Sequence, residues 1–220
     1  MRITKETVAV LQNFYTINPS IQFQPGNVLR TVSTTESIFA TATVAEEFPQ
    51  EAALYDLSKF LGLLSLNKED SEVEFKDKYL EIRQGHSKIK YSYCSADLIM
   101  TPPKGKSIKL KDNFVQFELK RDVFNGLVKA MSILGFSEVA VVGNNGVLTL
   151  QTLSSRTDEG DSYSTELGET DKEFFALFDA EKLKLIQDDY LVSISEKGIS
   201  HFKGSIAEYW ITLQSDSKFE

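Results

Sequence analysis

The chain has 220 residues, 41% of them hydrophobic and 25% charged, and a formal net charge of −8, which suits a folded globular protein. Its single cysteine excludes an internal disulfide, and no apolar run approaches the roughly 20 residues that a membrane-spanning helix needs. The first residues lack the apolar segment of a secretion signal, so we expect a cytosolic protein.

The first half of the chain predicts two helices among short strands. Thr4 is a suitable N-cap for a helix over residues 4–17, which places Val8, Leu11, Phe14 and Tyr15 on a core-facing side. Asp56 is a suitable N-cap for a second helix, to about residue 66, with Phe60, Leu61 and Leu64 facing the core. Alternating and β-branched residues predict strands over 21–23, 28–32, 38–44, 52–55, 72–75, 79–83 and 88–93.

The second half repeats this order. A strand over 114–119 precedes a helix over 120–134 that ends at Gly135. The core positions predicted for that helix are Phe124, Leu127, Val128, Met131 and Leu134. Asn144-Asn145-Gly146 predicts a hairpin turn, and Asp179 is expected to cap a fourth helix to about Ile186. Strands are expected over 138–142, 147–152, 162–167, 174–178, 190–195, 199–202 and 207–213. The tail over 214–220 is expected to be loose apart from Phe219.

The two halves also share a local motif. Leu54-Tyr55-Asp56-Leu57 and Leu177-Phe178-Asp179-Ala180 each lead from a strand into a helix. This repetition predicts an α+β fold of two similar domains, each a curved antiparallel sheet with two helices on one face. We expect domains over 1–100 and 114–220, joined by a connector over 101–113 that Pro102 and Pro103 stiffen.

The predicted helices carry cations on the side opposite their core residues. These polar sides hold Lys5, Gln12, Lys59, Lys120, Arg121, Lys129, Lys182 and Lys184. Amphipathic helices commonly expose lysine to water, so ordinary solvation is enough to explain the cations of any single helix. Over four equivalent helices, a shared positive surface that binds phosphates without reading base sequence is the alternative.

No group of residues predicts a catalytic or metal site. His86 and His201 lack a second ligand at metal-binding spacing, and Cys94 has no recognisable base partner, which favours a neutral thiol. Asp56 and Asp179 are better explained as helix caps than as a pair of catalytic carboxylates. We therefore expect no enzyme activity, no metal and no cofactor.

Three segments resemble one known family. Residues 1–7 (MRITKET) and 11–18 (LQNFYTIN) resemble the start of the sliding clamps of T-even-type bacteriophages, and residues 54–66 (LYDLSKFLGLLSL) resemble their second helix. The resemblance implies a DNA polymerase processivity factor with a DNA clamp fold. It also implies a homotrimeric ring around double-stranded DNA, with the helices lining the hole. An ATP-driven clamp loader would open the ring, and the clamp itself would hydrolyse nothing.

The resemblance also implies partners and site residues. The partners are DNA polymerase, the clamp loader and late-transcription sigma and co-activator proteins, in the cytoplasm of the infected bacterial host, with no membrane. The DNA-facing residues would be the eight residues of the polar helix sides, although Gln12 stands where the family has lysine. Subunit contacts would fall on Lys88, Ile89, Tyr91, Tyr93, Ser162, Tyr163, Thr165 and Leu167.

A partner pocket is expected beside the connector. Its candidates are Met100, Pro102, Ile108, Leu110 and Phe219, which could equally do no more than anchor the connector. Two rival hypotheses remain at this point: an enzyme that uses Cys94 or the acidic loops, and a non-enzymatic phage interaction scaffold that does not encircle DNA.

Overall fold

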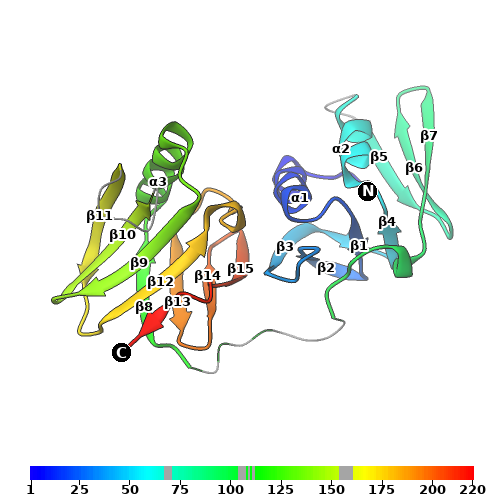
Figure 1. Ribbon diagram of the computed structural model, residues 1–220. Coiled ribbons are helices and arrows are strands. Elements are labelled where there is room, and N and C mark those ends of the chain that lie inside the picture. Colours follow the sequence, from blue (N-terminus) through cyan, green and yellow to red (C-terminus); the bar gives the residue numbers. More distant parts are fainter. Residues whose placement is uncertain (67–70, 104–107, 109, 111, 154–160) are drawn as a thin grey trace. The chain divides into compact units, whose positions relative to one another are not determined.

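The computed structural model describes residues 1–66, 71–103, 108, 110, 112–153 and 161–220. It divides into two compact units, Met1–Lys106 and Ser107–Glu220, and each unit is described by itself (Figure 1). Residues 104–107, 109 and 111 of the expected connector lie outside the described residues, as do residues 67–70 and 154–160. The domain bounds 1–100 and 114–220 therefore stay predictions.

The described residues of the first unit form two α-helices, α1 (Lys5–Ile17) and α2 (Leu57–Ser65), and a 3-10 turn, η1 (Ala96–Leu98). Its strands are β1 (Ile21–Phe23), β2 (Gly26–Val32), β3 (Ile38–Phe48), β4 (Ala52–Leu54), β5 (Ser71–Phe75), β6 (Tyr79–Gln84) and β7 (Ser87–Ser92). All its strand pairs are antiparallel: β1 with β4, β2 with β3, and β5 with β6 and β7 in that order. Both helices lie on the same side of these strands in Figure 1.

An aromatic cluster forms much of the first unit's core. Phe23 lies 4.7 Å from Phe48 and 6.1 Å from Phe60, measured between ring centroids, so β1, β3 and α2 meet at one point. Phe75 on β5 packs edge-on against Phe23 at 5.7 Å. These four rings join helix α2 to β1, β3 and β5. Aromatic pairs of this kind add stabilisation beyond their buried area.

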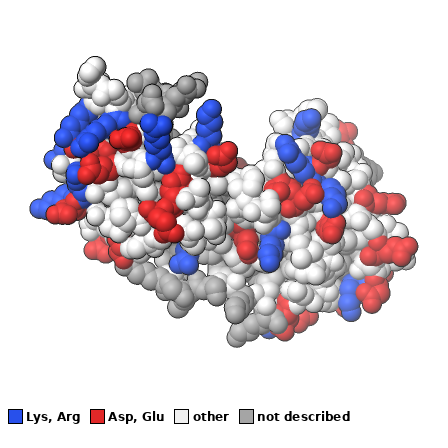
Figure 2. Space-filling model, turned by 180° about the vertical axis from the view of Figure 1, so that it is seen from behind, with Lys and Arg blue, Asp and Glu red and all other residues white. Residues whose placement is uncertain are grey.

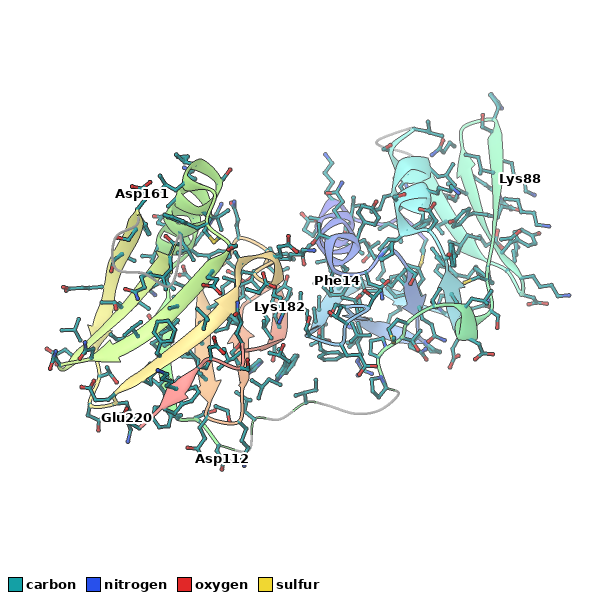
Figure 3. All side chains as sticks on the ribbon, in the orientation of Figure 1. Phe14, Lys88, Asp112, Asp161, Lys182 and Glu220 are labelled. Carbon is teal, nitrogen blue, oxygen red and sulfur yellow. The ribbon has the colours of Figure 1, made fainter. Side chains whose placement is uncertain are left out.

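Helix α1 forms where Thr4 predicts it, but its buried side is rotated from the predicted one. Leu11 and Phe14 are fully buried as expected, and Figure 3 shows Phe14 on the side of α1 nearest the strands. Val10 and Ile17 complete that side, whereas Tyr15 is 42% exposed. The prediction of Tyr15 as a core residue was therefore wrong, since Val10 and Ile17 fill the helical positions that face the sheet.

The second unit contains one α-helix, α3 (Arg121–Leu134), and one 3-10 turn, η2 (Ala180–Lys182), within its described residues. One sheet has the order β11 (Ser162–Glu169), β10 (Val147–Leu153), β9 (Glu138–Asn144), β12 (Phe174–Asp179) and β16 (Lys218–Phe219). The other runs β15 (Ala207–Thr212), β14 (Ile199–Lys203), β13 (Tyr190–Ser195) and β8 (Val115–Leu119). The α+β class with antiparallel sheets is thus confirmed.

The predicted fourth helix is wrong beyond its first turn. Asp179 does cap η2, accepting a hydrogen bond from the Glu181 N–H at 3.1 Å, but η2 ends at Lys182. Leu183 and Leu185 are both buried. Burial of every second residue is typical of extended chain, and it prevents the helix from continuing.

Two further predictions for the second unit need correction. Val128 and Leu134 of α3 are 38% and 42% exposed, and Ile133 is 80% exposed, so only Phe124 and Leu127 of that helix are buried. The tail is ordered at other residues besides Phe219, because Lys218 pairs with Phe175 in β16 and the Gln214 N–H donates to the Leu177 carbonyl at 2.8 Å. In the part of the chain that the structure describes, no helix is long and apolar enough to cross a membrane.

Candidate nucleic-acid interface and strand edges

The predicted cations of α1 and α2 are exposed. Lys5 and Gln12 lie on the side of α1 away from the buried Leu11 and Phe14. Lys59 is exposed on α2, and its Nζ lies 3.2 Å from the Asp56 carboxylate. The first unit therefore offers separated positive charges with a neutral Gln12 among them.

The cations of the second unit are more strongly paired. Lys120 is the N-cap residue of α3, and its Nζ lies 2.8 Å from Glu118 and 3.8 Å from Asp189. The hydrogen bond to Glu118 raises the pKa of the Lys120 ammonium. The Asp189 carboxylate also accepts from the backbone N–H of Arg121 at 2.7 Å. These acids offset much of the positive charge at the start of α3.

The remaining predicted DNA-facing residues differ in exposure. Lys129 is exposed on α3, and Lys184 is exposed just after η2. Lys182 is half-buried, with its Nζ 3.4 Å from the Thr212 hydroxyl (labelled in Figure 3). The structure thus places the eight predicted residues on α1, α2, α3 and the η2 segment, and it leaves most of them exposed.

The acid excess lies almost entirely in the second unit. Residues 1–106 hold 12 Lys and Arg against 13 Asp and Glu, a net charge of −1, whereas residues 107–220 hold 12 against 19, a net charge of −7. Figure 2 shows cationic and anionic side chains interspersed on the face that it presents. A positive helix side is therefore a sparse, local feature of the molecule.

Asp56 and Asp179 both act as helix caps. The Asp56 carboxylate accepts hydrogen bonds from the Ser58 hydroxyl at 2.6 Å and from the Lys59 N–H at 3.0 Å. These bonds stabilise the ionised form and lower the pKa of Asp56 to about 2. Each carboxylate is held by its own helix start, so neither is arranged for acid–base chemistry.

Strand β7 forms one edge of its sheet among the described residues. Ile89 and Tyr91 are half-buried and alternate with the exposed Lys88, Lys90 and Ser92. The Tyr91 hydroxyl donates to the Asp56 carbonyl at 2.7 Å, which ties β7 to the start of α2. Lys88 projects from β7 away from α2 (Figure 3).

Tyr93 follows the end of β7 and lies outside the strand. Its N–H donates to the Lys78 carbonyl at 3.0 Å, and burial raises the pKa of its hydroxyl to about 12. Tyr93 is therefore directed into its own unit more than the neighbouring strand residues are.

Strand β11 forms an edge of the second unit's larger sheet in the same way. Tyr163, Thr165 and Leu167 are half-buried, and they alternate with the exposed Ser162, Ser164 and Glu166. Helix α3 comes close to this strand, because a Cβ built on Gly126 would lie 2.8 Å from the Tyr163 hydroxyl oxygen. Both units thus present an edge strand with a polar side, a less exposed side and a helix beside it.

The predicted pocket residues fall in different settings. The Met100 carbonyl accepts from the Asn18 side-chain amide at 3.2 Å, and the Met100 residue is 39% exposed. Pro102, Ile108 and Leu110 are half-buried. The Phe219 ring lies 5.1 Å from Phe114 and 6.1 Å from Phe174, measured between ring centroids.

Sequence patterns did not predict that Phe114 and Phe174 lie beside Phe219. Phe114 borders an open hollow of about 540 Å³ that Gly146, Thr170 and Lys172 also line. The Lys172 Nζ lies 5.7 Å from the Phe114 ring centroid, a cation–π contact. The signal available in the sequence was the presence of Phe114 and Phe174 at the starts of two predicted strands.

His201 and Cys94, two of the residues considered for catalysis, contact neighbouring side chains or are partly buried. His201 Nε2 lies 2.8 Å from the Glu208 carboxylate, and its ring stacks on Trp210 at 4.4 Å. Burial raises the pKa of the Cys94 thiol, which agrees with the predicted neutral state. Within the described residues, no three His, Cys, Asp or Glu side chains are grouped to hold a metal ion.

Comparison with known proteins gives matches along the whole chain. A family model described as "DNA polymerase processivity factor" matches residues 4–101, and one described as "gp45 sliding clamp, C terminal" matches residues 116–215. The sliding clamp of Vibrio phage KVP40 is 32% identical over 98% of this chain and 100% of its own length. That of Enterobacteria phage T4 is 26% identical over 99% of this chain and 98% of its own length.

Solved structures show the same fold at low identity. The A. fulgidus PCNA bound to the C-terminal region of FEN-1 has a TM-score of 0.70 and 13% identity, with 96% of both chains covered. The H. pylori beta clamp has a TM-score of 0.65 and 16% identity over 94% of this chain, which spans only 61% of the length of that clamp. Two family models that together match most of the chain confirm the resemblance seen in the first 66 residues, and the chain belongs to the DNA polymerase processivity factor family of phage sliding clamps.

Proposed function

We propose that three copies of this chain close head to tail into a ring that encircles duplex DNA. The observation that carries the proposal is the presence of two different edge strands, β7 and β11, one on each unit of the chain. An exposed edge is a template for pairing with another strand. When β7 of each copy meets β11 of the next, the contact is heterologous, and a heterologous contact whose rotation closes gives a ring.

Exposed apolar side chains at the ends of α2 and α3 are further candidates for a contact with a second copy. Leu66, the residue after α2, is 67% exposed, and Ile133 of α3 is 80% exposed. Burying such side chains against a second copy contributes roughly 1.5–3 kcal/mol for each one. Ile89 and Leu167, half-buried on the two edges, would extend the apolar part of the junction.

The helix cations would face the DNA. A lining of Lys5, Lys59, Lys129 and Lys184, with the neutral Gln12 among them, binds phosphates by charge and reads no sequence. Arg121 is exposed and would add to this lining. Lys120, with two acids beside its ammonium, and the half-buried Lys182 would contribute less, whereas Lys59 has the single acid Asp56 beside it. Few contacts suit a protein that must slide, because each tight phosphate contact would slow it.

The clamp would tether DNA polymerase in the cytoplasm of an infected bacterial host. An ATP-driven clamp loader would open the ring, late-transcription sigma and co-activator proteins would be further partners, and the clamp would carry out no chemical step. The C-terminal region of FEN-1 bound to PCNA and a DNA ligase peptide bound to a beta clamp support peptide docking. We place part of the docking surface at Phe219 and Phe114, and Met100, Pro102, Ile108 and Leu110 stay predicted contributors.

Sedimentation equilibrium tests the assembly without DNA or partners. A closed ring of three predicts a mass near three times 24.7 kDa at micromolar concentration. A monomer mass across the accessible concentration range would exclude the ring.

A further inference from the structure

The two edge strands carry opposite charges. Strand β7 has the sequence SKIKYS, with two lysines and no acid, and β11 has the sequence SYSTELGE, with two glutamates and no base. Lys88, Lys90, Glu166 and Glu169 are all exposed. The edge strand β7 of the first unit is therefore basic, and the edge strand β11 of the second unit is acidic.

The two lysines of β7 differ in how far their charge is already offset. The Lys88 Nζ lies 2.7 Å from the carboxylate of Glu81, a residue only 2% exposed. The Lys90 Nζ lies over the Tyr79 ring, 4.4 Å from its centroid. Among the described residues, neither Lys90 nor Glu166 has an ion-pair partner.

The backbone of β7 sets which residues can pair outward. The Tyr93 N–H donates to the Lys78 carbonyl, and antiparallel bonding alternates along a strand, so Ile89 and Tyr91 bond to β6. The N–H and C=O groups of Lys88, Lys90 and Ser92 consequently point away from the sheet.

The same alternation holds on β11. The two-residue turn Asn145-Gly146 makes Asn144 and Val147 a bonded pair of β9 and β10. Leu150 and Thr152 then bond to the other neighbour, at Thr165 and Tyr163. The backbone groups of Ser162, Ser164 and Glu166 are therefore left for an outside strand.

We propose that Lys90 of one copy pairs with Glu166 of the next and that this ion pair makes each junction sensitive to ionic strength. The inference rests on the proposed ring. In the antiparallel register that places Lys90 opposite Glu166, Ser92 meets Ser164, and the less exposed Ile89 and Tyr91 lie beside Leu167 and Thr165. Polar side chains then face polar ones, and the outward backbone groups of both strands are paired.

Charge reversal on the full-length chain tests this pair. Lys90→Glu and Glu166→Lys are each expected to raise the concentration at which the trimer half-dissociates by about tenfold, since each places like charges opposite one another. The combined variant Lys90→Glu/Glu166→Lys is expected to return to within about threefold of the parent, because the attraction is restored with its direction exchanged. Lys203→Glu and Glu196→Lys, exposed and away from both edges, are the matched controls and are expected to have no effect.

Sedimentation is measured at low and high NaCl, without DNA, with circular dichroism as the check on folding. The parent trimer is expected to weaken as salt rises, and Lys90→Met is expected to reduce that dependence even if it also weakens the trimer. A trimeric parent with single reversals that behave like their controls would overturn the ion pair and leave the ring standing. A combined variant no better than the single ones would overturn it too, and a parent that never assembles would overturn both proposals.

Discussion

Glu46 lies on β3 with its carboxylate against the first turn of α1. It is only 6% exposed and accepts hydrogen bonds from the Thr4 N–H and the Thr7 hydroxyl. A capping box usually supplies such an acceptor from the third helical residue. Here Thr7 occupies that position, and a distant strand supplies the carboxylate.

Removing the Glu46 carboxylate should destabilise the first unit. Glu46→Ala leaves two donors without their acceptor, which costs about 1–3 kcal/mol of unfolding free energy. Urea unfolding followed by circular dichroism measures the change. Glu47→Ala on the exposed side of the same strand is the control, and equal losses for the two variants would contradict this role.

Glu46 should also make stability depend on pH. Burial alone would raise its pKa, but the hydrogen bonds from Thr7 and Thr4 outweigh burial and hold the pKa below its usual value of 4.5. Because the folded pKa is the lower one, the stabilisation is complete above pH 4.5 and is lost as pH falls through the folded value. Glu46→Gln should flatten this acid limb in a series of melting temperatures.

Variants of Asp56 separate the stabilisation that comes from the N-cap hydrogen bond from the stabilisation that comes from the carboxylate charge. Asp56→Ala should cost about 1 kcal/mol at neutral pH, whereas Asn is as good an N-cap as Asp, so Asp56→Asn should cost much less. The Asp56 carboxylate titrates, and its folded-state pKa is lowered to about 2, so its charge-dependent stabilisation is lost as pH falls from near 3.8 toward 2. An Asn side chain does not titrate and shows no such loss. Thermal melts at pH 7 and pH 3 distinguish the two effects, and an Asn variant with an unchanged acid limb would be the contrary result.

At the scale of elements, two glycines test how tightly strands and helices pack. A Cβ on Gly143 of β9 would lie 2.3 Å from the Lys172 carbonyl oxygen and 2.6 Å from the Phe174 ring, whereas a Cβ on Gly62 of α2 would meet no atom within 4 Å. Gly143→Ala should therefore destabilise by about 1–3 kcal/mol, and Gly62→Ala should stabilise by about 0.5–1 kcal/mol. Differential scanning calorimetry gives both values, and a tolerated Gly143→Ala would contradict the close packing at β12.

Local signals predicted most elements correctly. Thr4 and Asp56 mark the starts of α1 and α2, and the Asn-Gly turn marks the hairpin of β9 and β10. The fourth helix failed because a capping Asp specifies only the first turn, and the burial of Leu183 and Leu185 makes the next residues extended. Sequence patterns also could not show Glu46 at Thr4 or β16 beside β12, because both contacts join residues far apart in the chain.

The candidate site was predictable to a similar degree. Helical periodicity placed Lys5, Lys59 and Lys129 on exposed sides, since that depends on local geometry. It could not show that the Lys120 ammonium lies 3.8 Å from Asp189, an acid that comes from a loop distant in the chain. The neutralisation of a cation depends on the fold as a whole.

At the scale of the whole molecule, the helix cations should control how the clamp is held on DNA. Lys59→Glu combined with Lys129→Glu should weaken retention on DNA at low salt, and the loss should shrink as salt rises, because phosphate contacts release counterions. Fluorescence anisotropy of a short labelled duplex titrated with the clamp measures its affinity for DNA at each salt concentration. Lys203→Glu is the control for net charge, and an equal loss for the control would argue against a specific lining.

The proposed ring would hold DNA by encircling it. Labelled clamp loaded onto a nicked circular plasmid, and separated from free protein by gel filtration, tests that claim when the plasmid is then cut once with a restriction enzyme. Topological tethering predicts that the clamp stays on the closed circle and leaves after the cut, when it can slide off the new ends. Equal loss from the circle and from the linear DNA would contradict encirclement.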